Sequence, residues 1–509
     1  MIPQGIARRV AKGALWLLAA RWGVRVLGIV STIMLARLLL PEDYGLVGMA
    51  TLLYFLVQSA SDFSLDMDLI RSGARDRARY DTVWTLEVMR GIANAAVVLL
   101  LAVPAAIMLH EPRLPAIAGC IAAISAVSGF ANVGVVEFRS DLNFSKEGVY
   151  TVLVKLVSFA VAVPAAFMLR NYWALVAGLS AGAAARLALS YVMHPYRPRF
   201  SLACFCEVFG FSKWLWFSSQ LFFVRTKSDE LFVGKFAGIE ALGFYRIARA
   251  VAEMPTSELI TPVMNAIFPG FTRISGAGRS LAEGYLAVLG GGLCLMAPLA
   301  FGLLVTADLV LDLGFGRQWA AAAPLLRLLA FAGPLEMFVG NAYAVFLALG
   351  RPHLSTYASL TGAGVFLALL AVLVPWFGPI GAALALIGAS LAGGIANLYL
   401  AQSLLALPKR DLFEALWRPV AAAASMAAFV QAFRGIVPLP EGWQLAACAV
   451  LGAPIYVTVL FTLWATGGYP KGAEATIAAY LEARLLPRLP FLPKWLLSLR
   501  AAAKPPAAR

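Results

Sequence analysis

Long apolar segments follow one another along nearly the whole chain, each about 20 to 30 residues in length and separated by short connections. A helix needs about 20 apolar residues to cross a bilayer, whereas the strands of a membrane barrel alternate between apolar and polar positions. The pattern therefore predicts an all-α integral membrane protein with about fourteen membrane-spanning helices. The expected spans are 13–39, 43–66, 80–109, 113–136, 145–169, 172–194, 211–236, 240–268, 281–306, 320–349, 354–376, 379–406, 412–433 and 443–466.

Basic residues gather in alternate connections and so indicate the orientation of the helices. The connections on one side carry Arg71, Arg75, Arg77, Arg79, Arg139, Lys146, Arg197, Arg199, Arg273, Arg279, Lys409 and Arg410. The connections on the other side hold mainly Arg113, Arg170, Arg317 and Arg434. Because Lys and Arg favour the cytoplasmic side, the asymmetry predicts that both termini are cytoplasmic.

Composition narrows the classes of function. The chain has 509 residues, of which 61% are hydrophobic and 13% charged, and its net charge is +14. The orientation pattern accounts for most of this charge, so we expect no nucleic-acid partner. The five cysteines and three histidines have no metal-binding spacing, and no phosphate-binding loop motif occurs. We therefore expect no metal, no cofactor and no catalytic group.

Several basic residues lie inside the apolar segments, where a charge costs about 2.5–3.5 kcal/mol on insertion scales. They are Arg21, Arg25, Lys155, Arg225, Lys227 and Arg246. Such residues usually face a watery cavity or a polar partner, and here the surplus is cationic. The sequence thus predicts substrate-binding residues for an anion such as a lipid diphosphate. For Lys155 the alternative is snorkelling, because it lies about three turns from the inner end of its helix.

Arg21 and Arg25 are four residues apart and therefore share one face of the first helix. A guanidinium is permanently charged and forked, which suits phosphate and favours a diphosphate clamp. The alternative is that these arginines pair with acidic groups such as Asp62 on the next helix.

Segment 211–236 carries charges of both signs. Arg225 and Asp229 are four residues apart, and Lys227 and Glu230 are three apart. Either spacing permits an ion pair that stiffens the helix. The alternative is an ion or proton relay, for which Asp229 is the ion-coupling candidate.

Segment 240–268 places Arg246, Arg249 and Glu253 on one helical face. The spacing of Arg249 and Glu253 permits a salt bridge, which leaves Arg246 less clearly paired.

The two halves of the chain contain a repeat. Residue pairs 198 positions apart match at the corner between two helices: Trp16 and Trp214, Arg37 and Lys235, Glu42 and Glu240, Gly45 and Gly243, Ala50 and Ala248. A shift of six helices restores the same orientation, so the halves are expected to form parallel lobes with the substrate between them. We expect an N-lobe at 1–205, a C-lobe at 206–407 and two additional helices at 408–468.

The final stretch, 469–509, differs from the rest. Ile477, Tyr480, Leu481 and Leu485 recur at helical spacing with basic residues between them. This predicts a basic amphipathic helix on the inner membrane surface.

Two stretches resemble one known family. The segment Leu35-Ala36-Arg37-Leu38-Leu39-Leu40-Pro41-Glu42-Asp43-Tyr44-Gly45 is similar to the first hairpin of bacterial Wzx-type polysaccharide flippases, in the multidrug-exporter and lipid-flippase (MATE/MOP) superfamily. A second stretch, from Lys227-Ser228-Asp229 through Gly243-Phe244-Tyr245 to Phe268-Pro269-Gly270-Phe271, resembles the seventh and eighth helices of that family.

The resemblance implies a function and a location. Relatives translocate polyprenyl-diphosphate-linked oligosaccharide across the bacterial inner membrane by ion-coupled alternating access, for surface polysaccharide synthesis, alongside polymerase machinery. Many relatives carry an Asp-hydrophobic-Gly step in the second helix, and this resemblance makes Asp62 a second ion-coupling candidate. The sequence departs from the step, because Ser64 follows Asp62 and Phe63. The alternatives are a lipid II-type flippase, a multidrug exporter of the same superfamily and a polysaccharide polymerase. Short outer connections argue against an enzyme.

Overall fold

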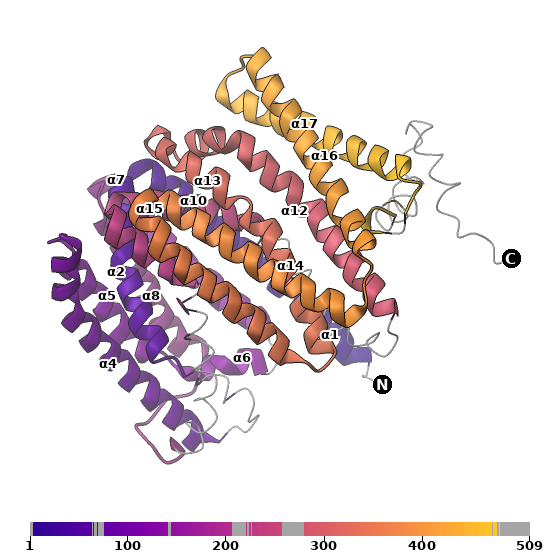
Figure 1. Cartoon of the computed structure of the whole chain (residues 1–509). Helices are drawn as coiled ribbons and strands as arrows, with labels where there is room; N and C mark the ends of the chain where they lie inside the picture. Colours follow the sequence, from indigo (N-terminus) through magenta and orange to yellow (C-terminus); the bar gives the residue numbers. More distant parts are fainter. Residues whose placement is uncertain are drawn as a thin grey trace. The chain divides into compact units, whose positions relative to one another are not determined.

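The computed structural model describes residues 4–63, 65, 69, 76–140, 144–205, 220, 223–224, 226–256, 279–470, 472–475 and 478. Throughout these residues the regular structure is helical, as Figure 1 shows. Eight helices in this part of the chain are long and apolar enough to cross a membrane. The predicted all-α membrane fold is confirmed, while the full number of fourteen helices stays a prediction.

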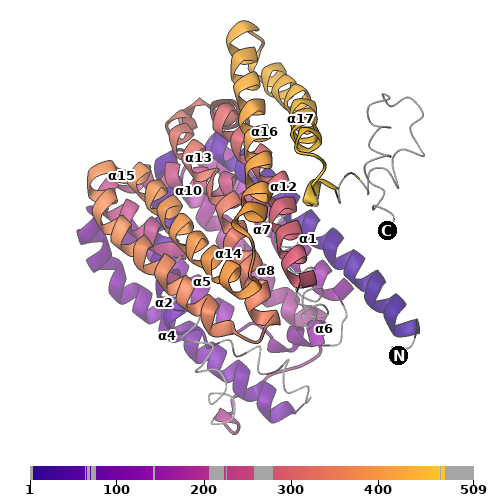
Figure 2. The same cartoon turned by 45° about the vertical axis from the view of Figure 1, so that its right-hand side comes forward.

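The chain forms two compact units, Met1–Arg246 and Ile247–Arg509. The first unit contains α1 (Gln4–Leu38), α2 (Pro41–Ala60), α4 (Arg77–Leu109), α5 (Leu114–Gly129), η1 (Val133–Val136), α6 (Glu137–Ser140), α7 (Phe144–Leu169), α8 (Trp173–Met193), a helical stretch at 226–237 and the first half of α10 (Ile239–Pro255). Helix α7 packs against α1 and α8, and α5 packs against α2, α4 and α8. Helices α2, α4, α5 and α8 lie together in both Figure 1 and Figure 2.

The second unit contains the rest of α10, then α12 (Arg279–Gly314), η3 (Arg317–Ala322), α13 (Ala323–Leu329), α14 (Ala332–Ala348), α15 (Pro352–Leu405), α16 (Lys409–Ile436) and α17 (Glu441–Thr466). Helix α12 is its central element and contacts α13, α14, α16 and α17. The unit boundary follows packing and does not test the repeat, so the predicted lobes at 1–205 and 206–407 stay a prediction.

Most expected spans match observed helices, with two corrections. The expectation of a single helix over 113–136 is wrong, because α5 ends at Gly129 and η1 covers Val133–Val136. The expectation of a single helix over 320–349 is wrong, because this stretch divides into η3, α13 and α14. Pro334 lies in the first turn of α14, where its missing N–H is harmless, whereas in a continuous helix it would remove a hydrogen bond. The break expected at Phe377-Gly378-Pro379 is confirmed: Gly378 has φ 54° and ψ −133° inside α15.

The geometry of the first corner depends on Asp43. Its carboxylate accepts the Leu40 N–H at 2.9 Å and the Tyr172 N–H at 3.0 Å, so it fixes the start of α2 and the approach to α8. The neighbouring Glu42 pairs with Arg113, which also binds Glu111 at 2.7 Å. These hydrogen bonds from Arg113 lower the pKa of the Glu111 carboxyl.

Helices α2 and α10 cross at two glycines without space for a side chain. A Cβ on Gly45 would lie 1.8 Å from the Ile239 carbonyl oxygen, and one on Gly243 would lie 1.9 Å from the Pro41 carbonyl oxygen. The contact is reciprocal, because both Gly45 and Gly243, and Pro41 and Ile239, are 198 residues apart. The crossing thus supports the repeat as a local two-fold relation between the two helices.

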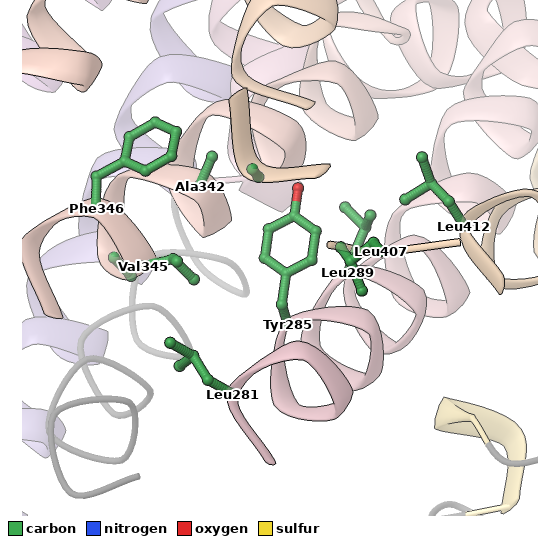
Figure 3. Close-up of a cluster of buried hydrophobic side chains, with 10 residues drawn as sticks. Leu281, Tyr285, Leu289, Ala342, Val345, Phe346, Leu407 and Leu412 are labelled. Atoms are coloured by element: carbon green, nitrogen blue, oxygen red, sulfur yellow. The ribbon is translucent and has the colours of Figure 1, made fainter. Parts of the chain in front are cut away.

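A cluster of buried side chains forms the base of the second unit. Figure 3 shows the Tyr285 ring of α12 between the α14 side chains and the pair Leu407 and Leu412. The buried members are Leu281, Tyr285, Leu289, Ala342, Ala344, Val345, Phe346, Ala401, Leu407 and Leu412. Asn341 donates to the Tyr285 carbonyl at 2.9 Å and so joins α14 to α12 within this cluster.

A buried ion pair attaches the start of the C-terminal stretch to α16. The side chains of Arg418 and Glu474 are 4% and 3% exposed, and Arg418 Nη1 lies 3.7 Å from Glu474 Oε1. Ala473 beside Glu474 packs on α12, since a Cβ on Gly290 would lie 3.3 Å from its Cβ. Most of the predicted amphipathic tail lies outside the described residues.

Replacing Gly45 with Ala is expected to lower the melting temperature of the protein in detergent, at a cost of about 1–3 kcal/mol, because the new methyl group overlaps the Ile239 carbonyl. Gly302→Ala is the matched control in α12, where nothing lies within 4 Å of the added carbon. Equal melting temperatures for both variants would contradict the tight crossing.

Replacing Arg418 with Ala is expected to destabilise the second unit by about 3–5 kcal/mol, because it leaves the buried Glu474 carboxylate without this cation. Thermal unfolding of the purified protein measures the effect. Arg410→Ala is the control: Arg410 also pairs with an acidic residue of α16, but its side chain is 86% exposed. A similar response of the two variants would show that the Arg418–Glu474 pair is not a structural anchor.

Candidate functional site

The helical stretch 226–237 runs along α2 in the opposite direction. A Cβ on Gly234 would meet the Met49 methyl group, and Lys227 lies over the Phe55 ring at 5.8 Å. Further along, the Gln220 side chain donates to the Ser59 carbonyl. Helix α10 packs against α2 around Gly45 and Gly48. The stretch 226–237 and α10 therefore both contact α2 near its middle.

At this convergence a single carboxylate bridges two cations. Glu230 Oε1 lies 2.5 Å from Lys227 Nζ, and Glu230 Oε2 lies 3.2 Å from Arg246 Nη1. Arg246 Nη1 also donates to Thr51 Oγ1 at 3.3 Å. We call Lys227, Glu230 and Arg246 the charge cluster. The Lys227–Glu230 pair expected from sequence is confirmed, whereas the interpretation of Arg246 as less clearly paired is wrong.

Gly48 of α2 makes room for the arginine of this cluster. A Cβ at Gly48 would lie 2.5 Å from Arg246 Nη1 and 2.8 Å from Arg246 Cδ. The guanidinium therefore lies directly on the α2 backbone, and any side chain at position 48 would displace it.

Asp229 lies beside the cluster and is fully buried. Its Oδ2 accepts the hydroxyl proton of Tyr245 at 2.5 Å, and its Oδ1 accepts the Glu230 N–H at 2.9 Å. Tyr245 is also fully buried, so this hydrogen bond joins the stretch 226–237 to α10. These contacts favour a structural role for Asp229; its proposed ion-coupling role stays a prediction.

The expected membrane spans 211–236 and 240–268 include all three residues of the charge cluster. Glu230 and Arg246 are each about 10 Å of helix from the connection between residue 237 and Ile239, and Lys227 is about 15 Å from it. In a hydrocarbon core about 30 Å thick, such depth makes partners necessary for the charges. The bridge supplied by Glu230 meets this requirement.

A second group of cations lies further from the corresponding helix ends. Arg25 on α1 and Lys155 on α7 are each about 20 Å of helix from the ends at Leu38 and Leu169. The two helices pack together, and a Cβ on Gly28, one turn from Arg25, would lie 3.8 Å from Lys155 Cε. Both side chains are half-buried, whereas Arg21, one turn further in, is exposed.

Asp62 has a partner that sequence inspection missed. Its Oδ1 lies 3.7 Å from Nη1 of Arg90 on α4, and Arg90 also pairs with Glu87. This ion pair joins the end of α2 to α4, as well as supplying a partner for the half-exposed Asp62. The alternative of Arg21 or Arg25 pairing with Asp62 stays a prediction, as does an ion-coupling role for Asp62.

The structure brings together some of the predicted residues and not others. Lys227 and Arg246 meet in the charge cluster, and Arg25 and Lys155 lie on packed helices. Arg225 falls outside the described residues. The predicted Arg249–Glu253 salt bridge is confirmed at 2.7 Å. The sequence predicts Glu230 as a helix-stiffening partner or a relay group but gives no signal for its contact with Arg246, because that contact joins two helices.

The fold is that of a multi-pass helical membrane protein, and its charge cluster holds two cations and one carboxylate. Within the described residues, no group of three or more His, Cys, Asp or Glu side chains is arranged to hold a metal ion. A family model described as polysaccharide biosynthesis protein matches residues 34–324. The chain belongs to this family, and the predicted resemblance to polysaccharide flippases is confirmed at the level of the family.

Three relatives extend the comparison. The succinoglycan biosynthesis transport protein ExoT of Rhizobium meliloti is 25% identical over 65% of this chain and 68% of its own length. The lipopolysaccharide biosynthesis protein WzxC of Escherichia coli is 25% identical over 66% and 69%. The teichuronic acid biosynthesis protein TuaB of Bacillus subtilis is 23% identical over 69% and 74%.

Two solved structures share the fold. The lipid II flippase MurJ in its inward closed conformation superposes with a TM-score of 0.70 and 14% identity, over 89% of this chain and 99% of its own. An inward-facing multidrug resistance MATE family transporter of the MOP superfamily gives a TM-score of 0.57 and 13% identity, over 75% and 94%. At these identities the likeness concerns the fold alone.

Replacing Tyr245 with Phe is expected to cost about 1–3 kcal/mol of stability, because it removes a donor from the buried Asp229 carboxylate. Thermal unfolding in detergent measures the change. Tyr357→Phe is the control, because its side chain is exposed on α15. An unchanged melting temperature for Tyr245→Phe would show that the hydrogen bond does not hold the two helices together.

Proposed function

We propose that this protein translocates a polyprenyl-diphosphate-linked oligosaccharide from the cytoplasmic to the outer leaflet of the bacterial inner membrane, for the synthesis of a surface polysaccharide. The observation that carries the proposal is the placement of cations at two depths of the first unit, Arg25 with Lys155 and Lys227 with Arg246. A dianionic diphosphate is the part of such a substrate that cannot cross the hydrocarbon core without compensating charges.

The diphosphate and the polyprenyl tail of the substrate occupy different surroundings during transport. The cations bind the diphosphate through charge-assisted hydrogen bonds, while the polyprenyl tail remains in the lipid. Alternating access then exposes the same site first to one leaflet and then to the other. This mechanism involves no covalent chemistry. Both termini are cytoplasmic in this proposal, and the polysaccharide polymerase machinery receives the product at the outer face.

The decisive experiment follows lipid-linked oligosaccharide in cells that lack this chain. We expect it to accumulate on the cytoplasmic leaflet while surface polysaccharide is lost. Intermediates that reach the outer leaflet but stay unpolymerised would indicate a polymerase, and a defect confined to the cell-wall precursor would indicate a lipid II-type flippase. Unchanged glycolipids with altered drug sensitivity would indicate a multidrug exporter.

Arg25 tests the second group of cations, Arg25 and Lys155. Arg25→Ala is expected to reduce export of surface polysaccharide at least tenfold with normal membrane insertion, whereas Arg25→Lys retains part of it because the charge remains. Complementation of the deletion strain and immunoblotting of membranes give both quantities. Arg410→Ala, which changes an exposed arginine of α16, is the matched control. Full export by Arg25→Ala would contradict a role of Arg25 in substrate binding.

A further inference from the structure

Glu230 is more buried than the two cations that it bridges. Its side chain is 6% exposed, whereas those of Lys227 and Arg246 are 31% and 28% exposed. The carboxylate is therefore enclosed behind the two cations, and the cations retain accessible surface. An anion that approaches this cluster meets a pair of positive groups whose charge is already partly compensated.

Glu230 bridges the two cations through both of its carboxylate oxygens. One oxygen of Glu230 contacts the ammonium group and the other contacts the guanidinium. Arg246 contacts Glu230 and Thr51 through the same nitrogen, Nη1. A guanidinium has five N–H donors in a fixed fork. The remaining donors of the fork suit a second, bidentate anion.

We propose that Glu230 is an internal counter-anion that lowers the affinity of Lys227 and Arg246 for the diphosphate headgroup, so that the site releases its substrate. This inference rests on the proposed function. A charge about 3 Å from both cations weakens their attraction for any other anion, and the effect is large where water is scarce. Two uncompensated cations at this depth would bind a dianion too firmly for turnover.

The opposite role predicts the opposite result. If Glu230 served only to hold Lys227 and Arg246 in a geometry that binds the diphosphate, then its neutralisation would weaken binding. If Glu230 is a counter-anion, then its neutralisation strengthens binding and slows release. The sign of the change in affinity therefore distinguishes the two roles.

The test uses the full-length protein in lipid nanodiscs and radiolabelled farnesyl diphosphate as the probe. Glu230→Gln is expected to bind the probe roughly tenfold more tightly than the parent and to release it more slowly. The same variant is expected to export less surface polysaccharide in cells. Glu230→Asp keeps the charge on a shorter side chain, which weakens the bridge. The affinity of this variant for the probe is expected to lie between those of the parent and Glu230→Gln.

Two controls separate this inference from the proposed function. Glu253→Gln removes another carboxylate that is paired with an arginine, Arg249, and should leave probe affinity unchanged. Lys227→Ala and Arg246→Ala should each weaken binding. If they do so while both Glu230 variants bind like the parent or more weakly, the counter-anion role is wrong. If neither cation affects binding, the diphosphate site itself is wrongly placed.

Discussion

The close crossing of α2 and α10 is the constraint on which the charge cluster depends. Gly45 and Gly243 each press against a carbonyl oxygen of the opposite helix, so the two backbones touch with no side chain between them. Only this approach allows Arg246 to lie on Gly48 and to reach Thr51. The crossing also aligns α2 with the stretch 226–237, which places Lys227 over Phe55. A tight contact between two backbones thus determines where the charges meet.

The repeat explains why those charges fit. The positions 198 residues before Lys227, Glu230 and Arg246 are Ile29, Thr32 and Gly48, so the first repeat carries no ionisable group at any of the three. If both repeats carried cations here, like charges would face one another at low dielectric. The glycine that corresponds to Arg246 is the residue that gives this arginine its space. The symmetry of the backbone and the asymmetry of the charges are therefore both necessary for the cluster.

Much of the fold was predictable from sequence because membrane helices are limited by length and apolar composition. The Gly378 break was predictable because turn chemistry depends on neighbours in the chain. The pairs Lys227–Glu230 and Arg249–Glu253 were predictable because helical spacing is also a local property. Contacts between helices were not predictable in this way. The bridge from Glu230 to Arg246 depends on how α10 packs against its neighbour, and that register leaves no trace in spacing.

A site that moves an anion through a membrane must satisfy two opposed conditions. Its cations need partners when no substrate is bound, because a bare charge in the hydrocarbon core is costly. They also need to bind the substrate weakly enough to let it leave. A carboxylate that is enclosed behind the cations meets both conditions, since it compensates them in the empty state and reduces their pull on a bound diphosphate. The burial of Glu230 relative to Lys227 and Arg246 is the arrangement that these conditions require.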